Sequence, residues 1–155
     1  MIPFIDLQAQ RRRLGDGLAR AITDAVESGQ WVLGPQVAAL EEQLAAFAGV
    51  KHAVTCANGT DALLLVLRAW GIGPGDAVFV PAFTFAATAE VVALAGAVPV
   101  FVDVREDTFN MSAVSLEAAI QLVKREARLE PRAIIPVDLF GQPADYREIA
   151  PIAAR

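Results

Sequence analysis

The chain has 155 residues, 55% of them apolar, and a formal net charge of −5 at pH 7. This composition excludes general disorder, and the acidic balance disfavours a protein that binds the phosphate backbone of nucleic acids. No apolar stretch approaches the roughly 20 residues that a bilayer crossing needs, so no membrane span is expected. Because Met1–Asp6 lacks a basic segment followed by a long apolar run, we expect no secretory signal and predict a cytoplasmic protein.

Two amphipathic helices are expected at the start of the chain. The first ends near Ser28–Gly29, with Gly29 as a left-handed cap, and its apolar stripe is formed by Leu14, Leu18, Ile22 and Val26. The second begins at Pro35 and ends at Gly49, with a stripe formed by Val37, Leu40, Leu44 and Phe47. The basic run Arg11–Arg13 is interpreted as a solvated face of the first helix.

From residue 49 onward, apolar strands and helices alternate. The expected strands span residues 52–57, 77–80, 98–102 and 133–137. The expected helices span residues 60–70 and about 85–95, followed by one through Leu116, Ile120, Val123 and Ala127 and a short one from Asp145. The strands are continuous apolar runs, which is typical of a parallel sheet covered on both faces. The predicted fold class is therefore α/β, with three layers and a mainly parallel sheet flanked by helices.

Several residue types limit the chemistry. Cys56 is the only cysteine and lies in an apolar run, so we expect a buried thiol and no internal disulfide. His52 is the only histidine and has no neighbouring ligand, so no metal site is expected. The glycine-rich run at residues 71–76 superficially resembles a dinucleotide loop, but it follows a helix and precedes a strand, so we interpret it as a turn. This disfavours a dinucleotide-binding oxidoreductase.

The two middle helices, at residues 60–70 and 85–95, are apolar nearly all round. We therefore expect them to be buried on more than one side, by further chain or by another subunit.

The segment Asn58–Gly59–Thr60 joins an expected strand to an expected helix. The first N–H groups of a helix have no partner within it, and the helix dipole favours an anion there. Gly59 allows a phosphate to approach the backbone, and the Thr60 hydroxyl can donate one more hydrogen bond. The residues alone leave a second interpretation open, in which Asn58–Gly59 is only a turn and Thr60 or Asp61 only a cap.

A second segment, residues 81–88, also follows a strand and begins a helix. Ligands of parallel sheets bind at the carboxyl ends of the strands, so both loops can open on one crevice. Phe85 could stack there on a planar ring, although packing in the core is the alternative for an aromatic side chain.

These segments and others in the same order resemble the DegT/DnrJ/EryC1/StrS family of sugar aminotransferases. The matching runs are residues 4–7, 31–35, 58–63, 81–88, 99–104 and 138–145. The resemblance implies the aspartate-aminotransferase type I fold, with pyridoxal 5′-phosphate as cofactor and pyridoxamine phosphate as its amine-carrying form. It also implies amine transfer from an amino acid, usually glutamate, to a nucleotide-linked keto sugar, in polysaccharide or glycoside biosynthesis. The run 56–63 is similar to members that aminate 3-keto UDP-N-acetylhexosaminuronates.

The resemblance also implies roles for single residues. Gly59 and Thr60 match the phosphate anchor, with Asn58 where serine is common, and Phe85 matches the aromatic residue that stacks on the pyridine ring. Trp31 matches a segment near the active site and is a candidate substrate contact. The first helix, with Arg11–Arg13, is similar to an arm that commonly packs in a homodimer.

The resemblance assigns residues 1–155 to the N-terminal part of the cofactor-binding large domain. Residues 1–48 form the helical arm and residues 49–155 the α/β core. The two lysines, Lys51 and Lys124, do not match the catalytic position. The Schiff-base lysine and the ring-pairing aspartate are thus expected beyond Arg155, and the chain alone is expected to be inactive. The alternatives are a sugar dehydratase of the same fold and a non-catalytic truncated homologue or regulator.

Overall fold

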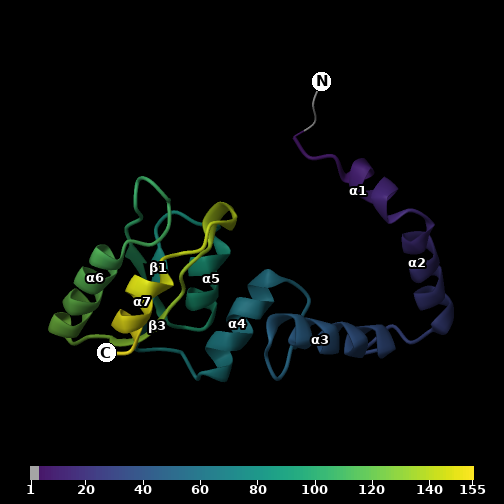
Figure 1. Cartoon of the computed structure of the whole chain (residues 1–155). Helices are drawn as coiled ribbons and strands as arrows, with labels where there is room; N and C mark the ends of the chain where they lie inside the picture. Colours follow the sequence, from purple (N-terminus) through teal and green to yellow (C-terminus); the bar gives the residue numbers. More distant parts are fainter. Residues whose placement is uncertain (1–3) are drawn as a thin grey trace. The chain divides into compact units, whose positions relative to one another are not determined.

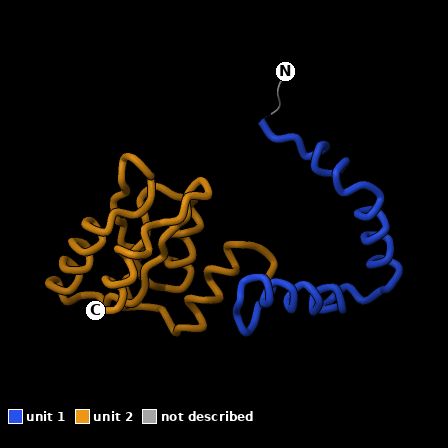
Figure 2. The backbone as a smooth tube through the Cα atoms, in the orientation of Figure 1, with its two compact units in different colours: residues 1–55 blue, residues 56–155 orange. Residues whose placement is uncertain are grey.

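The structure, a computed structural model, describes residues 4–155 and consists of two compact units. Figure 2 shows them in different colours: one ends at Thr55 and the other spans Cys56–Arg155. Residues 1–3, on which the expectation about a secretory signal partly depends, lie outside the described part. Within it, no helix combines the length and the apolar character that a membrane crossing requires.

The first unit contains three helices, α1 (Leu7–Leu14), α2 (Asp16–Ser28) and α3 (Pro35–Ala48). The prediction of one helix through Leu14 and Val26 is wrong at its start, because Gly15 separates α1 from α2. Gly15 has φ 57° and ψ −149°, a combination that is essentially restricted to glycine, so the helical hydrogen bonding stops there.

The expected ends of α2 and α3 are confirmed. Gly29 and Gly49 cap these helices in the left-handed conformation, each with φ 66°. Pro35 occupies the first turn of α3, where its missing N–H costs no hydrogen bond. Local signals of this kind act within a few residues, which is why the sequence alone places them correctly.

The predicted strand at residues 52–57 and the predicted burial of Cys56 are both wrong. No strand of the described residues pairs with this segment, and Cys56 is exposed, as is Val54. An apolar run becomes a strand only when a neighbour completes its backbone hydrogen bonds, and both sides of β1 are already taken by other strands. Instead, Glu41 Oε1 accepts hydrogen bonds from Thr55, from its N–H at 2.8 Å and its hydroxyl at 2.9 Å.

The second unit has a three-stranded parallel sheet with the order β2-β1-β3, formed by β1 (Asp76–Pro81), β2 (Val98–Val102) and β3 (Glu130–Ile134). The α/β fold class and the strands near residues 77–80 and 98–102 are confirmed. The fourth predicted strand is displaced, because β3 begins three residues before Ala133 and ends at Ile134. A register shift beside Ala77 and Val78 accompanies its pairing with β1.

Helices cover both faces of this sheet, as Figure 1 shows. They are α4 (Gly59–Ala69), α5 (Ala87–Leu94), α6 (Ala113–Glu126) and α7 (Tyr146–Ala153), with a short 3-10 turn, η1 (Leu139–Gly141), before α7. Successive residues of β1 point to opposite faces: Ala77 and Phe79 pack with α6 and α7, whereas Val78 and Val80 pack with α4 and α5. The three-layer arrangement predicted from the continuous apolar strands is therefore present.

The helices α4 and α5 pack against each other on one face of the sheet and run in the same direction. A Cβ placed on Gly96 (φ +83°) would lie 3.3 Å from the ring carbons of Pro74, so the turns that follow the two helices touch at the amino ends of the strands. Both helices therefore begin towards the carboxyl edge of the sheet. The glycine-rich run 71–76 is a turn, as predicted.

The expectation that further chain or another subunit covers the two middle helices stays a prediction, because the structure contains neither. Leu67 is the only buried residue of α4, whereas α5 buries four residues, Ala87, Thr88, Val91 and Val92. Leu65 and Val66 of α4 are exposed.

Replacing Leu116 with alanine tests the α6 side of the core. Leu116 is 0% exposed, so the truncation should lower the free energy of unfolding by about 2–5 kcal/mol. Leu122→Ala is the matched control, because Leu122 lies on the same helix but is 49% exposed, and its effect should stay below about 1 kcal/mol. Urea unfolding followed by circular dichroism measures both, and equal effects would contradict the packing of α6.

The contact between Glu41 and Thr55 predicts a pH effect. The backbone N–H of Thr55, and then its hydroxyl, lower the pKa of Glu41. The stability that this contact contributes should therefore be present above the ordinary pKa of glutamate and be lost as pH falls through the lowered value.

In Thr55→Val, which removes only the hydroxyl, the pKa of Glu41 should rise but stay below its ordinary value. Titration of the Glu41 carboxyl carbon by NMR measures this, with Thr23→Val as the control on α2. A pKa unchanged by Thr55→Val would refute the contact.

Candidate functional site

The start of α4 has the features of an anion site. Asn58 is the N-cap, and its Oδ1 accepts a hydrogen bond from the Asp61 N–H at 2.9 Å. Among residues 4–155, the N–H groups of Gly59 and Thr60 have no acceptor. Two adjacent amides at the positive end of an 11-residue helix are thus free to bind a phosphate.

Gly59 and Thr60 leave room for such a group. A Cβ added to Gly59 would meet nothing within 4 Å, so the backbone faces open space and a phosphate can approach it. Thr60 is half-buried, and its hydroxyl has no partner within the described chain. The interpretation of Asn58 as a cap and that of Gly59 and Thr60 as an anchor are compatible, because they use different atoms.

Asp61 places a carboxylate in the same helical turn. Asn58 Nδ2 donates to Asp61 Oδ2 at 3.1 Å, so the Asn58 side chain holds both the amide and the carboxylate of Asp61. The Asp61 carboxylate would repel a phosphate bound at Gly59 and Thr60, so its charge does not favour an anion at the helix start.

Phe85 precedes α5 and is 78% exposed, so it is not packed in the core. Its carbonyl accepts a hydrogen bond from the Thr88 N–H at 3.1 Å, and the hydroxyls of Thr84 and Thr88 lie 3.2 Å apart. At the other end of the segment, the Ala82 N–H donates to the Val102 carbonyl at 2.8 Å. These bonds attach residues 82–86 to β2 and α5 while the ring of Phe85 stays free to contact a ligand.

The two candidate loops share one end of the second unit. Gly59 and Thr60 begin α4, Phe85 lies just before α5, and both helices begin towards the carboxyl edge of the sheet. No hydrogen bond or ring contact within residues 4–155 joins Phe85 to the start of α4. The two loops therefore form two separate surfaces that one ligand could contact.

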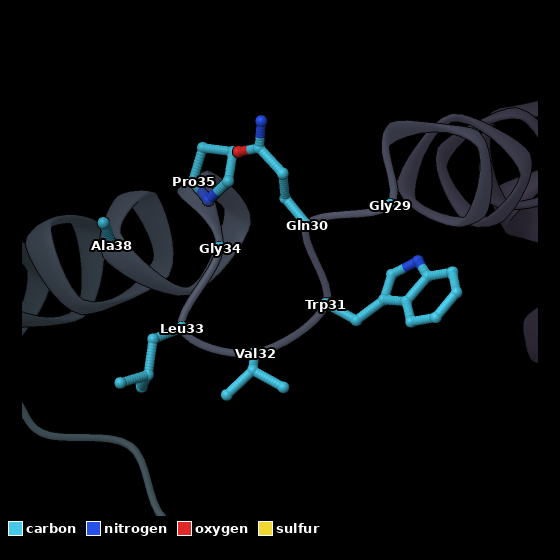
Figure 3. A pocket seen from close by; sticks show the side chains of 8 residues that line it. All are labelled: Gly29, Gln30, Trp31, Val32, Leu33, Gly34, Pro35 and Ala38. Carbon is cyan, nitrogen blue, oxygen red and sulfur yellow. The ribbon is translucent and has the colours of Figure 1, made fainter.

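Trp31 lies in the first unit, in the loop between α2 and α3 that Figure 3 shows. The loop lines a surface hollow of about 580 Å³, and the indole N–H of Trp31 donates to the carbonyls of Ala25 and Val26 at 3.2 Å each. A Cβ on Gly34 would collide with the carbonyl of Gln30, so the tight turn requires glycine there. Trp31 thus caps the end of α2, and a role in substrate binding stays a prediction.

The two lysines lie away from this end of the sheet or in the other unit. Lys124 is near the end of α6, and with Glu130 and Arg132 it lines a hollow at the amino end of β3. That is the edge opposite to Thr60 and Phe85. Lys51 is exposed and belongs to the first unit.

Sequence reasoning missed an aromatic cluster at the carboxyl edge, formed by Phe83, Phe109 and Phe140, which follow β1, β2 and β3 respectively. The ring centroid of Phe83 lies 5.5 Å from that of Phe109 and 6.4 Å from that of Phe140, and the last two lie 6.2 Å apart. The only available signal was that each phenylalanine follows a predicted strand. Phe109 and Phe140 both have a left-handed backbone conformation, which the sequence does not indicate.

Comparisons with known proteins show the family and the fold of this chain. The family model described as the DegT/DnrJ/EryC1/StrS aminotransferase family matches residues 13–155. A crystal structure of a DegT DnrJ EryC1 StrS aminotransferase from Brucella abortus superposes with a TM-score of 0.97 at 58% identity, covering 100% of this chain and 42% of that one.

Curated relatives are similar over the whole chain. The UDP-2-acetamido-2-deoxy-3-oxo-D-glucuronate aminotransferase of Pseudomonas aeruginosa is 48% identical over 155 residues, which are 100% of this chain and 41% of that protein. The UDP-N-acetyl-3-dehydro-alpha-D-glucosamine 3-aminotransferase of Acidithiobacillus ferrooxidans is 46% identical over 154 residues, 99% of this chain and 40% of the relative. The chain therefore spans about two fifths of the length of these relatives, and it belongs to the DegT/DnrJ/EryC1/StrS aminotransferase family.

Proposed function

We propose that the protein of which this sequence is given is a pyridoxal-phosphate-dependent aminotransferase that acts on a nucleotide-linked keto sugar. The observation that carries the proposal is the pair of free amides at Gly59 and Thr60, at the start of a helix that packs against the one preceded by Phe85. Since the chain spans about two fifths of its curated relatives, the reaction is proposed for the natural protein at its full length.

The residues of this chain supply binding and orientation. The amides of Gly59 and Thr60, with the Thr60 hydroxyl, bind the cofactor's phosphate, and the helix dipole of α4 favours the negative charge. The exposed ring of Phe85 lies against the pyridine ring and so sets its plane. When bound, pyridoxal phosphate supplies the electron sink for moving an amino group. Asn58 takes part indirectly, because it holds the helix start through Asp61.

The proposed substrate is a UDP-linked 3-keto sugar, and a 3-keto N-acetylhexosaminuronate is the specific candidate. The two curated relatives described above support this class by their names, which specify 3-oxo or 3-dehydro UDP sugars. Glutamate is the proposed amino donor, a homodimer that uses the N-terminal helices is the proposed assembly, and the cytoplasm is the proposed location.

Incubation of the natural protein with glutamate and such a keto sugar, followed by mass spectrometry, tests the reaction. Failure to form the amino sugar from any UDP-linked 3-keto sugar would reject the proposed substrate class.

Replacing Thr60 with valine tests the phosphate anchor. The change removes the hydroxyl but keeps the backbone amide, so the affinity for pyridoxamine phosphate should fall about tenfold or more, as expected for a hydrogen bond to a charged group. Thr60→Ser is the matched control and should bind nearly as well as the natural protein. Titration with pyridoxamine, which lacks the phosphate, should show no difference between the two variants. Equal affinities of both variants for pyridoxamine phosphate would contradict the anchor.

Replacing Phe85 tests the ring contact separately. Phe85→Ala should weaken cofactor binding about two- to tenfold, whereas Phe85→Trp keeps an aromatic face and should retain most of the affinity. Because Phe85 is exposed, neither change should alter the unfolding midpoint by more than a surface substitution does. An alanine variant that binds as well as the natural protein would place Phe85 outside the site.

The 155-residue chain by itself should show no transaminase turnover. Lys124 lies at the opposite edge of the sheet, and neither Lys124 nor Lys51 matches the lysine position of the family's sequence pattern, so we propose that neither bonds to a cofactor held by Thr60 and Phe85. The measurement is pyridoxamine phosphate formed from pyridoxal phosphate and glutamate by the purified chain. The control is non-enzymatic exchange in a solution of free lysine at equal concentration. Formation above that control would show that this prediction is wrong.

A further inference from the structure

Asn110 is a buried polar residue for which the proposed function gives no role. It is 3% exposed and lies in the loop between β2 and α6. Its Nδ2 donates to the carbonyls of Gln142 and Pro143 at 3.0 Å and 3.1 Å, and its Oδ1 accepts from the Leu139 N–H at 3.3 Å. One carboxamide thus satisfies three backbone groups of a loop about thirty residues away in the chain, and a buried Asn with all its bonds made holds that loop in one conformation.

The two loops that Asn110 joins each contain a phenylalanine with a strained backbone conformation. Phe109 directly precedes Asn110 and has φ 58°, and Phe140 directly follows Leu139 and has φ 57°. Left-handed φ values are uncommon for bulky residues and persist only where the surroundings impose them. Phe140 is 80% exposed, so burial of its ring does not impose this backbone conformation. The hydrogen bonds of Asn110 to the residues on either side of Phe140 fix the backbone there instead, and they reach Leu139, Gln142 and Pro143.

The aromatic cluster connects these loops to the cofactor-binding segment. Phe109 and Phe140 both contact Phe83, and Phe83 lies two residues before Phe85. The segment 82–86 is held by hydrogen bonds at Ala82 and Phe85 and between the Thr84 and Thr88 hydroxyls, and the ring of Phe83 adds packing between Ala82 and Thr84. Phe85 itself is exposed and so has little protein packing of its own.

We propose that Asn110 is a positioning residue for the cofactor ring: through the Phe83–Phe109–Phe140 cluster, it sets the direction in which Phe85 projects. This inference rests on the proposed function, because it assumes that Phe85 contacts the cofactor. A second tie, from the Ala144 N–H and the Tyr146 hydroxyl to Asp138 Oδ1 at 2.9 Å each, closes the same loop without reaching either ring. The loop therefore keeps an anchor when Asn110 is changed, while the rings lose their support.

A double-mutant cycle in the natural full-length protein tests the inference. The variants are Phe140→Ala, Phe140→Tyr and Asn110→Ala, each in the natural and in the Phe85→Ala background, and the probe is pyridoxamine phosphate. Phe140→Ala leaves folding intact because the ring is exposed, which keeps the test valid even if Asn110→Ala is unstable. The readouts are the dissociation constant, the circular dichroism of the bound cofactor, and the unfolding midpoint.

With Phe85 present, Phe140→Ala and Asn110→Ala should each weaken binding about two- to tenfold and change the cofactor's circular dichroism, and Phe140→Tyr should restore both. With Phe85→Ala, the same changes should have less than about a twofold effect, because the contact they support is already gone. Equal effects in both backgrounds, or no effect of Phe140→Ala, would overturn the inference alone. No binding by the natural protein would overturn the proposed function and the inference with it.

Discussion

The site depends on a packing constraint: α4 and α5 lie side by side on the Val78–Val80 face of the sheet, and the turns after them touch at Pro74 and Gly96. The helix α5 connects the parallel strands β1 and β2 and so must run back from the carboxyl edge, and α4, which leads into β1, runs in the same direction beside it. Both helix starts are consequently directed to that edge, where the free amides of Gly59 and Thr60 and the ring of Phe85 lie. None of these residues is distinctive by itself, so the proposed site depends on the two helices bringing them to the same edge of the sheet.

Three loops, one after each strand, build the carboxyl edge, and side chains rather than further strands connect them. The rings of Phe83, Phe109 and Phe140 meet there, and the Asn110 carboxamide ties two of the loops. A buried carboxamide with its bonds made is well suited to this, because any displacement leaves polar groups unpaired in the interior. The same edge therefore contains a rigid support and an exposed ring, which is the combination expected of a residue that orients a ligand.

The family membership and the geometry of the candidate site are independent observations that support the same proposal. Similarity over the whole chain establishes the family and the fold. The free amides and the exposed ring explain physically why the matching segments suit a phosphate attached to a planar ring. Lys124 lies at the amino end of β3, at the edge opposite to the proposed cofactor contacts.

Much of the fold could be predicted from the sequence, because its signals are local. The caps at Gly29 and Gly49, the start of α3 at Pro35, the turn at residues 71–76 and the two-sided covering of the sheet all depend on neighbouring residues or on the pattern of one strand. The sequence predicts Asn58, Gly59, Thr60 and Phe85 as site residues because each follows an expected strand, although the strand expected before Asn58 is absent. Tertiary structure alone decided what requires a distant partner. Residues 52–57 have strand-like composition, but without a pairing neighbour they are not a strand, and Cys56 is consequently exposed. The aromatic cluster and the contacts of Asn110 likewise join loops about thirty residues apart, and no pattern within either loop reports such a meeting.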